Sequence, residues 1–498
     1  MTHKRIVRTL AIFLLVPVIA AVAVNAPAPM AGFKVLHSFS GKDGGSPNSL
    51  IQATDGLFYG SAANGGDTNS CPSDGCGVLF KSDTSGNFVV LHVFHATDGY
   101  LPTGLVKGSD GNFYGTTMSG GQPSGGGGGT FFRLDPAGNF TVLYGFIGGL
   151  ACCDGGGPVG TPIQASDGNF YGTTGAGGAF RDTDHPGGFG TIYRFNPDSG
   201  QLTILHSFNL PDGNGIFPNG PLFQGSDGLL YGTTSEGGGA SHTSGGTAFR
   251  VDMSGNLSLV AVITGMEPPA GLIQAKDGFF YGTGQNAAGG SVYRLNTNGK
   301  LTFINRFDGA DGFNPHVGLL QAKDGFLYGT TSEGGLLDFQ GGDIFRLSAF
   351  EAVRVLHSFV ITGTDGFSPS SWLIQGSDGA LYGVNGGGGV NGHGTIFRID
   401  PRIPGPVASV TVNPTVIHSG QTSTGTVTLS SPAPAGGKVV TLGAGSFQMT
   451  IPASVKVAAG AKTAKFTIKA LQVGAAQTVR VYASFAGQGV RTTLKLQP

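Results

Sequence analysis

Seven acidic side chains recur at one position of a repeated unit, and their types and spacing could support chemistry. Six of the seven are Asp followed by Gly, which is ordinary turn chemistry, whereas Glu267 precedes Pro268. Brought together, such carboxylates could bind a calcium ion or an amine-bearing ligand. These acids either stabilise turns or form a cation-binding ring, and both interpretations stay open. The seven residues are Asp43, Asp98, Asp154, Asp212, Glu267, Asp311 and Asp365.

Cysteines form a second candidate group: Cys71, Cys76, Cys152 and Cys153. In an exported chain an even number of cysteines indicates disulfides, either a local bridge between Cys71 and Cys76 or two bridges between their loops. Adjacent cysteines fit tetrahedral metal ligation poorly, so a metal centre is the weaker interpretation.

Histidines that stand outside every repeated position are the third group, His185, His242, His316 and His393. Asp182 and Asp184 flank the first of them, which supplies the residue types of an acid–base pair. The sequence has no nucleophile elbow, phosphate-binding loop or His-rich metal spacing to accompany these histidines. No catalytic residue is therefore predicted.

A phrase that occurs seven times organises the chain: Asp-Gly, two further residues, then Tyr-Gly. The first copy begins at Asp55 and the last at Asp378, and neighbouring copies lie 47 to 60 residues apart. That spacing is the length of one four-stranded sheet with its turns. Asp-Gly between apolar segments is a strong hairpin signal, and long helical periodicity is absent. The sequence predicts an all-β fold, a seven-bladed β-propeller.

The two ends of the repeat array indicate that the propeller is closed. Residues 33–39 match the fourth strand of the repeat but precede any first strand, and the seventh repeat stops after its third strand at Asp400. If the N-terminal segment pairs as the outer strand of the seventh blade, no sheet edge is left free. We therefore predict a closed propeller over residues 33–400.

Each repeat continues from Asp-Gly through Tyr-Gly-Thr-Thr and Gly-Gly to Gly-Thr-Ile/Val-Phe-Arg/Lys, with departures such as Gly383-Val384. This pattern, over residues 33–400, resembles the GloVer tandem repeats of bacterial choice-of-anchor proteins. The resemblance implies a secreted or surface protein and brings no established activity or catalytic residues. Kelch repeats are the second resemblance, but their recurrent Trp is absent, since Trp372 is the only one.

Strand order assigns the loops to two faces of the ring. The turns from first to second and from third to fourth strand are short and uniform. The other loops are long, glycine-rich and different in every repeat, as in residues 60–77, 173–190 and 233–246. Binding residues concentrate on variable loops held by a rigid scaffold, so this variable face is the candidate functional face.

Polar side chains that recur in every blade are assigned to the blade itself, because a group that every blade needs serves the fold. One series is the Asp of the phrase, which could pair with a base in the third strand of each blade. Another is the His of the fourth strand, found at His37, His92, His206 and His357.

The two ends of the chain differ from the repeats. Residues 1–31 combine a basic start with an apolar run and small residues, which indicates a secretory signal peptide rather than a membrane span. Residues 401–406 are a Pro-rich linker, and residues 407–498 alternate Val, Thr and Ala with period two. This second part resembles a bacterial immunoglobulin-like β-sandwich, a module that usually serves as a spacer or an adhesive stalk.

The composition of the chain disfavours some classes of binding partner. Charged residues make up only 11% of the chain and the net charge is −1, with no basic face, so nucleic acids and anionic membranes are poor partners. We expect a secreted or cell-surface, non-enzymatic binding protein that recognises an extracellular protein or glycan through the variable face. The alternative is an extracellular enzyme acting on glycans or another polymer at the channel mouth. No cofactor is predicted unless the acid ring binds calcium.

Overall fold

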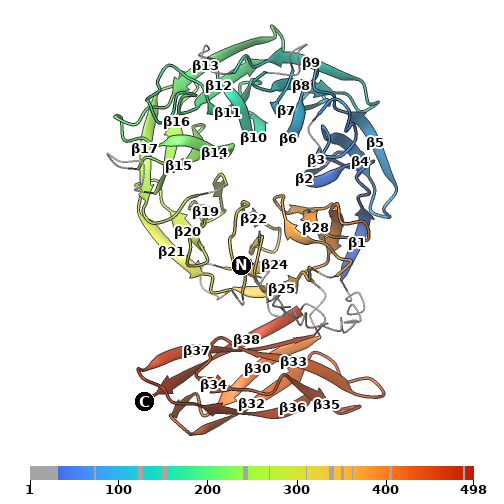
Figure 1. Cartoon of the computed structure of the whole chain (residues 1–498), viewed down its shortest axis with the longest axis vertical. Coiled ribbons are helices and arrows are strands. Elements are labelled where there is room, and N and C mark those ends of the chain that lie inside the picture. Colours follow the sequence, from blue (N-terminus) through green and yellow to red (C-terminus); the bar gives the residue numbers. More distant parts are fainter. Residues whose placement is uncertain are drawn as a thin grey trace, which may run out of the picture.

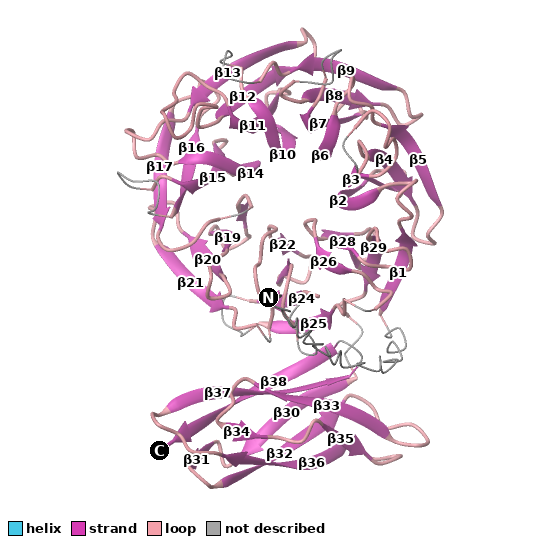
Figure 2. Ribbon diagram, viewed as in Figure 1, coloured by secondary structure: helices cyan, strands magenta, loops and turns pink. Residues whose placement is uncertain are grey.

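The computed structural model describes residues 32–498 apart from 72–73, 122–126, 149–153, 239–244, 269, 310, 336–340, 349–352, 362, 403–405 and 486–487. The predicted signal segment, Cys152, Cys153 and His242 lie outside these residues. The described chain is all-β, and none of it forms a helix long and apolar enough to cross a membrane (Figure 2). Seven sheets stand in a ring around a central axis, and two more form a separate C-terminal layer pair (Figure 1).

Six sheets of the ring are antiparallel meanders whose strands run outward in chain order. The first is β2 (Gly45–Gln52), β3 (Phe58–Asn64), β4 (Val78–Ser82) and β5 (Phe88–Val93). The second is β6 (Tyr100–Lys107), β7 (Phe113–Ser119), β8 (Thr130–Leu134) and β9 (Phe140–Gly145). The third is β10 (Gly156–Gln164), β11 (Phe170–Ala176), β12 (Thr191–Asn196) and β13 (Gln201–Ser207).

The next three sheets repeat this order. The fourth is β14 (Ile216–Gln224), β15 (Leu230–Glu236), β16 (Gly246–Val251) and β17 (Leu257–Ile263). The fifth is β18 (Ile273–Gln274), β19 (Phe280–Gly284), β20 (Ser291–Leu295) and β21 (Leu301–Arg306). The sixth is β22 (Leu320–Gln321), β23 (Leu327–Thr331), β24 (Asp343–Leu347) and β25 (Arg354–Ser358).

The seventh sheet joins the two ends of the ring. Its inner strands β26 (Phe367–Pro369) and β27 (Ile374–Gln375) pair with β28 (Leu381–Gly387), which pairs with β29 (Thr395–Ile399). Its outermost strand is β1 (Phe33–Ser38), antiparallel to β29 with Phe33 opposite Ile399. The two outer strands of this sheet, β29 and β1, therefore come from opposite ends of the repeat array, as Figure 1 shows.

The repeated phrase folds the way it does because each of its residues has a distinct contact. Gly56 adopts a φ of +83°, a conformation that favours glycine, and closes the turn between β2 and β3. The Asp55 carboxylate accepts hydrogen bonds from the Leu57 amide at 3.0 Å and the Tyr59 hydroxyl at 2.9 Å. At Gly60 an added Cβ would lie 2.5 Å from Cζ of Phe80, so only glycine admits that ring.

The second strand of each sheet is buried on both faces, as β3 shows with five consecutive buried residues from Phe58. The apolar cores accordingly lie between neighbouring sheets: Tyr59 of the first sheet packs with Phe113 and Phe132 of the second. Burial on both faces explains why this strand is apolar or small at successive positions rather than alternating.

Neighbouring sheets are also joined by a ring of hydrogen bonds at the uniform face. The side chain of the Gln that ends the first strand accepts from a backbone amide of the preceding sheet, as Gln164 does from Ser109 at 2.7 Å. Its amide group donates to its own turn, as from Gln164 to Gly168 at 2.9 Å. The same link recurs at Gln52, Gln224, Gln274, Gln321 and Gln375. Lys107 replaces Gln and donates to Thr54 at 2.7 Å.

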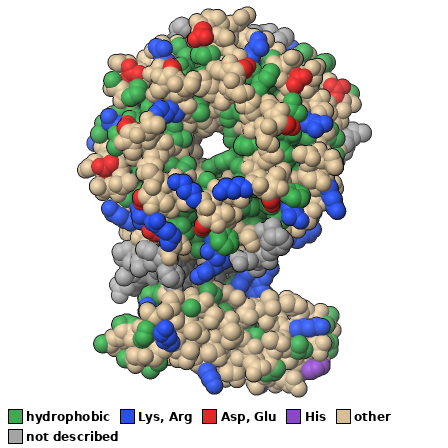
Figure 3. Space-filling model, turned by 180° about the vertical axis from the view of Figure 1, so that it is seen from behind, with side chains coloured by type: hydrophobic (Ala, Val, Ile, Leu, Met, Phe, Trp, Pro, Cys, Tyr) green, Lys and Arg blue, Asp and Glu red, His purple; other side chains and the backbone are tan. Residues whose placement is uncertain are grey.

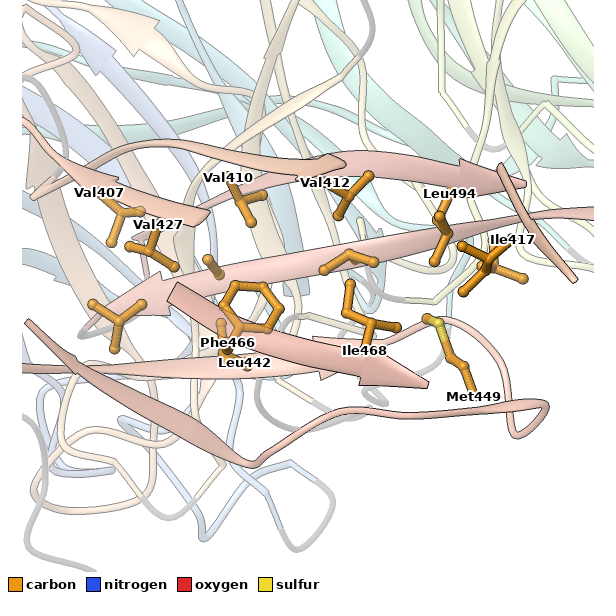
Figure 4. Close-up of a cluster of buried hydrophobic side chains, with 14 of the residues drawn as sticks. Val407, Val410, Val412, Ile417, Val427, Leu442, Met449, Phe466, Ile468 and Leu494 are labelled. Carbon is orange, nitrogen blue, oxygen red and sulfur yellow. The ribbon is translucent and has the colours of Figure 1, made fainter. Parts of the chain in front are cut away.

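The C-terminal residues form two packed sheets. One has the order β30 (Val407–Asn413), β32 (Thr422–Leu429), β36 (Thr463–Ala470) and β34 (Met449–Thr450). The other has β31 (Val416–His418), β38 (Gln488–Gln497), β37 (Gln477–Phe485), β33 (Lys438–Ala444) and β35 (Ser454–Val457). Side chains such as Val427, Phe466 and Ile468 fill the space between the sheets (Figure 4). This is a core separate from those of the ring.

The sandwich contacts the ring beside the sixth sheet, where β38 lies along β25. Arg480 and Arg491 form ion pairs with Asp308 and Asp311, both in the loop between β21 and β22. Asp311 is almost completely buried, so Arg491 supplies the charge that this carboxylate needs. Burial also raises the pKa of the neighbouring Asp343 well above its ordinary value, and the nearby negative charge of Asp311 adds to the effect.

Candidate functional site

A cavity of about 840 Å³ occupies the centre of the ring, within the size range of ligand sites. The innermost strands of all seven sheets contribute to its wall, from Asn48 in the first sheet to Trp372 in the seventh. Figure 3 shows an opening at the centre of the ring, bordered by hydrophobic side chains. The cavity lies within the channel and not on the variable loops alone, so the first strands are the elements that position its residues.

Strand geometry explains which residues face this cavity. Each sheet has a Pro within or shortly before its first strand, and the residue that follows this Pro lines the channel in six sheets. These positions lie at the end of the strand where the variable loops enter. The six residues are of five types: Asn48, Thr103, Val159, Asn219, His316 and Ser370. The channel therefore has a variable collar inside a repeated scaffold.

Hydrogen bonds between adjacent sheets, donated from first or second strands, hold this collar in place. Asn48 donates to the carbonyl of Pro102 at 2.7 Å, and Ser370 donates to the carbonyl of Pro47 across the junction of the first and last sheets. Threonines make the equivalent links between the middle sheets, from Thr103 to Gly160, Thr173 to Gly220, Thr233 to Ala270 and Thr283 to Val317. At the sixth boundary the Thr330 hydroxyl is buried without a hydrogen-bond partner among the described residues.

Trp372 projects from the seventh sheet at this same boundary. Its indole packs on Gly318 of the sixth sheet, where an added Cβ would fall 2.3 Å from the indole Cε2. Trp372 is partly exposed and lines the cavity. A planar aromatic surface is thus seated against one wall of the channel.

His316, four residues before β22, lies on the neighbouring part of the wall. Burial lowers the pKa of His316 below its ordinary value, so the imidazole is neutral at neutral pH. Its Nδ1 atom is buried and finds no hydrogen-bond partner among the described residues, while the residue as a whole is partly exposed. The backbone of Asn314 and the charge of Glu333 act against the pKa shift, and the residue lines the cavity.

The charge of the cavity wall is low. Among the described lining residues there is no Asp or Glu. Lys107 is the lining residue with a permanent positive charge, and its ammonium group is bonded to Thr54 toward the uniform face. The wall therefore presents neutral hydrogen-bonding groups on a mainly apolar surface.

The seven acids are not brought together in the channel, and none of them lines the cavity. Three pair with the His of the preceding fourth strand: Asp43 with His37 at 3.0 Å, Asp98 with His92 at 3.1 Å and Asp365 with His357 at 2.9 Å. Asp154 accepts from Tyr144, Asp212 from Asn209, and Asp311 from Arg491, whereas the Glu267 backbone pairs with Gln285.

The acid and His series are therefore connected in these three sheets, where each pair ties a loop back to the preceding outer strand. Stacking fixes the His on the other side: His37 lies on Phe88 with ring centroids 3.8 Å apart. Burial lowers the pKa of His37, although the charge of Asp43 opposes this shift. Within the described part of the chain no three His, Cys, Asp or Glu side chains group as metal ligands would.

The Asp of the repeated phrase pairs with Tyr rather than with the expected base. In every sheet of the ring the Tyr hydroxyl of the phrase donates to this Asp, at 2.6 to 2.9 Å. The predicted ion pair occurs in the seventh sheet, between Arg398 and Asp378 at 2.9 Å. In the fifth and sixth sheets the base stacks on an aromatic ring, Arg294 over Phe279 at 4.7 Å and Arg346 over Phe326 at 4.0 Å.

The remaining candidates lie away from the cavity. Cys71 and Cys76 form a disulfide within one variable loop. His185 bonds to Asp182 at 3.1 Å beside Phe217, and His393 packs against Gly41.

Trp372 and the strand-ending Gln residues were not singled out by the sequence analysis. Trp372 could have been found by aligning the first strands, because it stands where the other sheets have small residues.

The fold and channel define an all-β, propeller-like tandem-repeat protein. The chain belongs to the family described as the Gloeobacter/Verrucomicrobia repeat, which it matches over residues 27–178, 68–284 and 244–444. A comparison with curated proteins found no match.

Solved structures similar to this chain include virginiamycin B lyase from Staphylococcus aureus, a catalytically inactive variant with quinupristin. It is 14% identical with a TM-score of 0.49, covering 74% of this chain and 99% of its own. An α-L-arabinanase from Penicillium chrysogenum, complexed with arabinobiose, is 11% identical with a TM-score of 0.41, covering 74% and 98%. TolB from Acinetobacter baumannii is 14% identical with a TM-score of 0.34, covering 71% and 79%.

Proposed function

We propose that this chain is a secreted or cell-surface binding protein that holds an extracellular ligand in its central channel without transforming it. In this proposal residues 1–31 are a signal peptide, and the ring is a seven-bladed β-propeller closed by β1. The sandwich is an immunoglobulin-like domain, a proposal supported by a strand order of the type found in such domains.

One observation carries the binding role: the cavity of about 840 Å³ is lined by all seven sheets, and its described wall has no carboxylate. Glycoside hydrolysis normally needs two carboxylates flanking the scissile bond. The imidazole of His316 is on the wall without a carboxylate beside it among the lining residues, and the charge of Glu333 reaches it from outside the wall. A preformed cavity without an acid–base pair suits retention of a ligand better than its hydrolysis.

Exposed apolar residues on the variable face support entry of the ligand from that side. Ile147, Phe180 and Val390 lie on its loops and are 56%, 46% and 74% exposed. Exposed apolar side chains on this face favour its contact with a ligand or a partner surface.

A retention assay with turnover monitoring tests this function. The full chain would be incubated with a panel of extracellular glycans and small molecules, and bound and free material identified by mass spectrometry. We expect a retained and chemically unchanged ligand, lost when Asn219→Phe fills the channel. Asn298→Phe, on an exposed turn, is the matched control and should retain the ligand. Release of a product, or retention unaffected by Asn219→Phe, would contradict the proposal.

A further inference from the structure

Three irregularities of the repeat meet at the boundary between the sixth and seventh sheets. Trp372 and His316 line the cavity there, and Thr330 is the hydroxyl that breaks the series of links between sheets. An unpartnered buried hydroxyl costs stability, and a closed ring of similar sheets gives no reason to accept that cost at one boundary. This boundary is therefore the part of the channel most specialised for a ligand.

Trp372 is the clearest of these departures. It stands two residues before the residue that pairs with the Tyr of the phrase. At that position the other six sheets carry small residues: Ser49, Gly104, Thr161, Pro221, Gly271 and Gly318. Because Gly318 leaves room for the indole, the ring lies flat against a wall instead of blocking the channel. A flat, partly exposed indole offers a stacking surface.

Polar groups beside and opposite this surface define what can stack on it. His316 is neutral and lines the cavity next to this surface. Asn219 adds an amide on another part of the wall, and the described wall carries no carboxylate. A charged ligand would find no counter-charge near the indole, and a wholly apolar ligand would leave the imidazole and the amide without partners.

We propose that the channel binds a neutral saccharide, with one sugar ring stacked on Trp372 and a hydroxyl bonded to His316. A sugar ring matches the wall because it has an apolar C–H face and hydroxyl groups around its edge. Asn219 bonds a further hydroxyl across the channel. This inference rests on the proposed function and specifies the ligand class of the same site.

The single tryptophan makes a direct test feasible, because intrinsic tryptophan fluorescence of the full chain reports on this site alone. The probes are neutral gluco-, galacto- and xylo-oligosaccharides, with their uronic acid counterparts and an uncharged alkyl glycol as comparisons. We expect a saturable change of Trp372 emission with at least one neutral oligosaccharide and no change with the comparisons.

Variants test the assigned contacts by calorimetry. Trp372→Ala and His316→Leu should each weaken the affinity about tenfold or more, the loss expected for one stacking or hydrogen-bonding contact. His316→Gln keeps a hydrogen-bonding group and should recover part of the affinity. Gly318→Ala serves if Trp372→Ala fails to fold, because its Cβ displaces the indole. Asn298→Phe is the control and should bind as the wild type does.

The outcomes separate the two proposals. Saccharide binding that depends on Trp372 supports both. Binding of an anionic or alkyl ligand that depends on Trp372 overturns the saccharide class and leaves the channel function standing. Saccharide binding that is unchanged in the Trp372 and His316 variants overturns this site. If nothing binds in the channel, both proposals fall.

Discussion

Replacing Gly115 with Ala tests whether the last glycine of the repeated phrase is there for close packing. A Cβ at this position would lie 2.3 Å from the Gly104 carbonyl oxygen and 2.5 Å from Cζ of Phe132. Phe132 is fully buried in the core between sheets and has no room to withdraw. Overpacking of this kind costs about 1–3 kcal/mol, and the lower entropy of the unfolded Ala chain returns about 0.4–1 kcal/mol. The net expectation is a loss of about 1 kcal/mol.

Urea unfolding followed by Trp372 fluorescence measures this loss, because the only tryptophan lies in the ring. The midpoint should fall while the denaturant slope stays unchanged. Gly187→Ala is the matched control, since its Cβ would meet no atom within 4 Å, and surface changes of this kind stay within about 0.5 kcal/mol. Equal stabilities of the two variants would refute the packing argument.

Three further outcomes are expected. Tyr171→Phe removes a hydroxyl that donates to Asp167 at 2.7 Å and should lower the free energy of unfolding in urea by about 1 kcal/mol; an unchanged midpoint would contradict this. Arg491→Ala leaves the buried Asp311 carboxylate without its cation, so the sandwich should separate from the ring and the radius of gyration by X-ray scattering should rise; an unchanged scattering curve argues against that contact. The lowered pKa of His316 means that the unfolded chain binds more protons below the ordinary value of 6.5. Stability should therefore be complete above that pH and decline below it, and His316→Gln should reduce this slope in pH-dependent unfolding; an identical slope would rule out the contribution.

The repeated phrase allowed much of the fold to be predicted, because its contacts are local. Asp55 bonds to Leu57 and Tyr59, two and four residues further on. Interactions over such short separations leave a fixed pattern in the sequence. The same locality explains why each repeat forms its own sheet.

The candidate site was less predictable because its residues come from different repeats. The acids and the fourth-strand His form separate series in the sequence, whereas the structure joins Asp43 to His37 and leaves the acids away from the cavity. In the sequence His316 stood out only because it lies outside the repeated positions, whereas the structure places it on the channel wall. The relation between Trp372 and Gly318 depends on two sheets meeting, which no single repeat encodes.

The sequence by itself determined the all-β repeat architecture, because turn chemistry and close packing impose the same residues in every copy. The tertiary structure alone decided where the unlike residues meet. A ring brings the first strands of all seven sheets to one axis, so residues hundreds of positions apart, such as Asn48 and Trp372, share one cavity. The repeated residues specify the scaffold. The residues that differ from the repeat specify the site, because the ring brings them together at its axis.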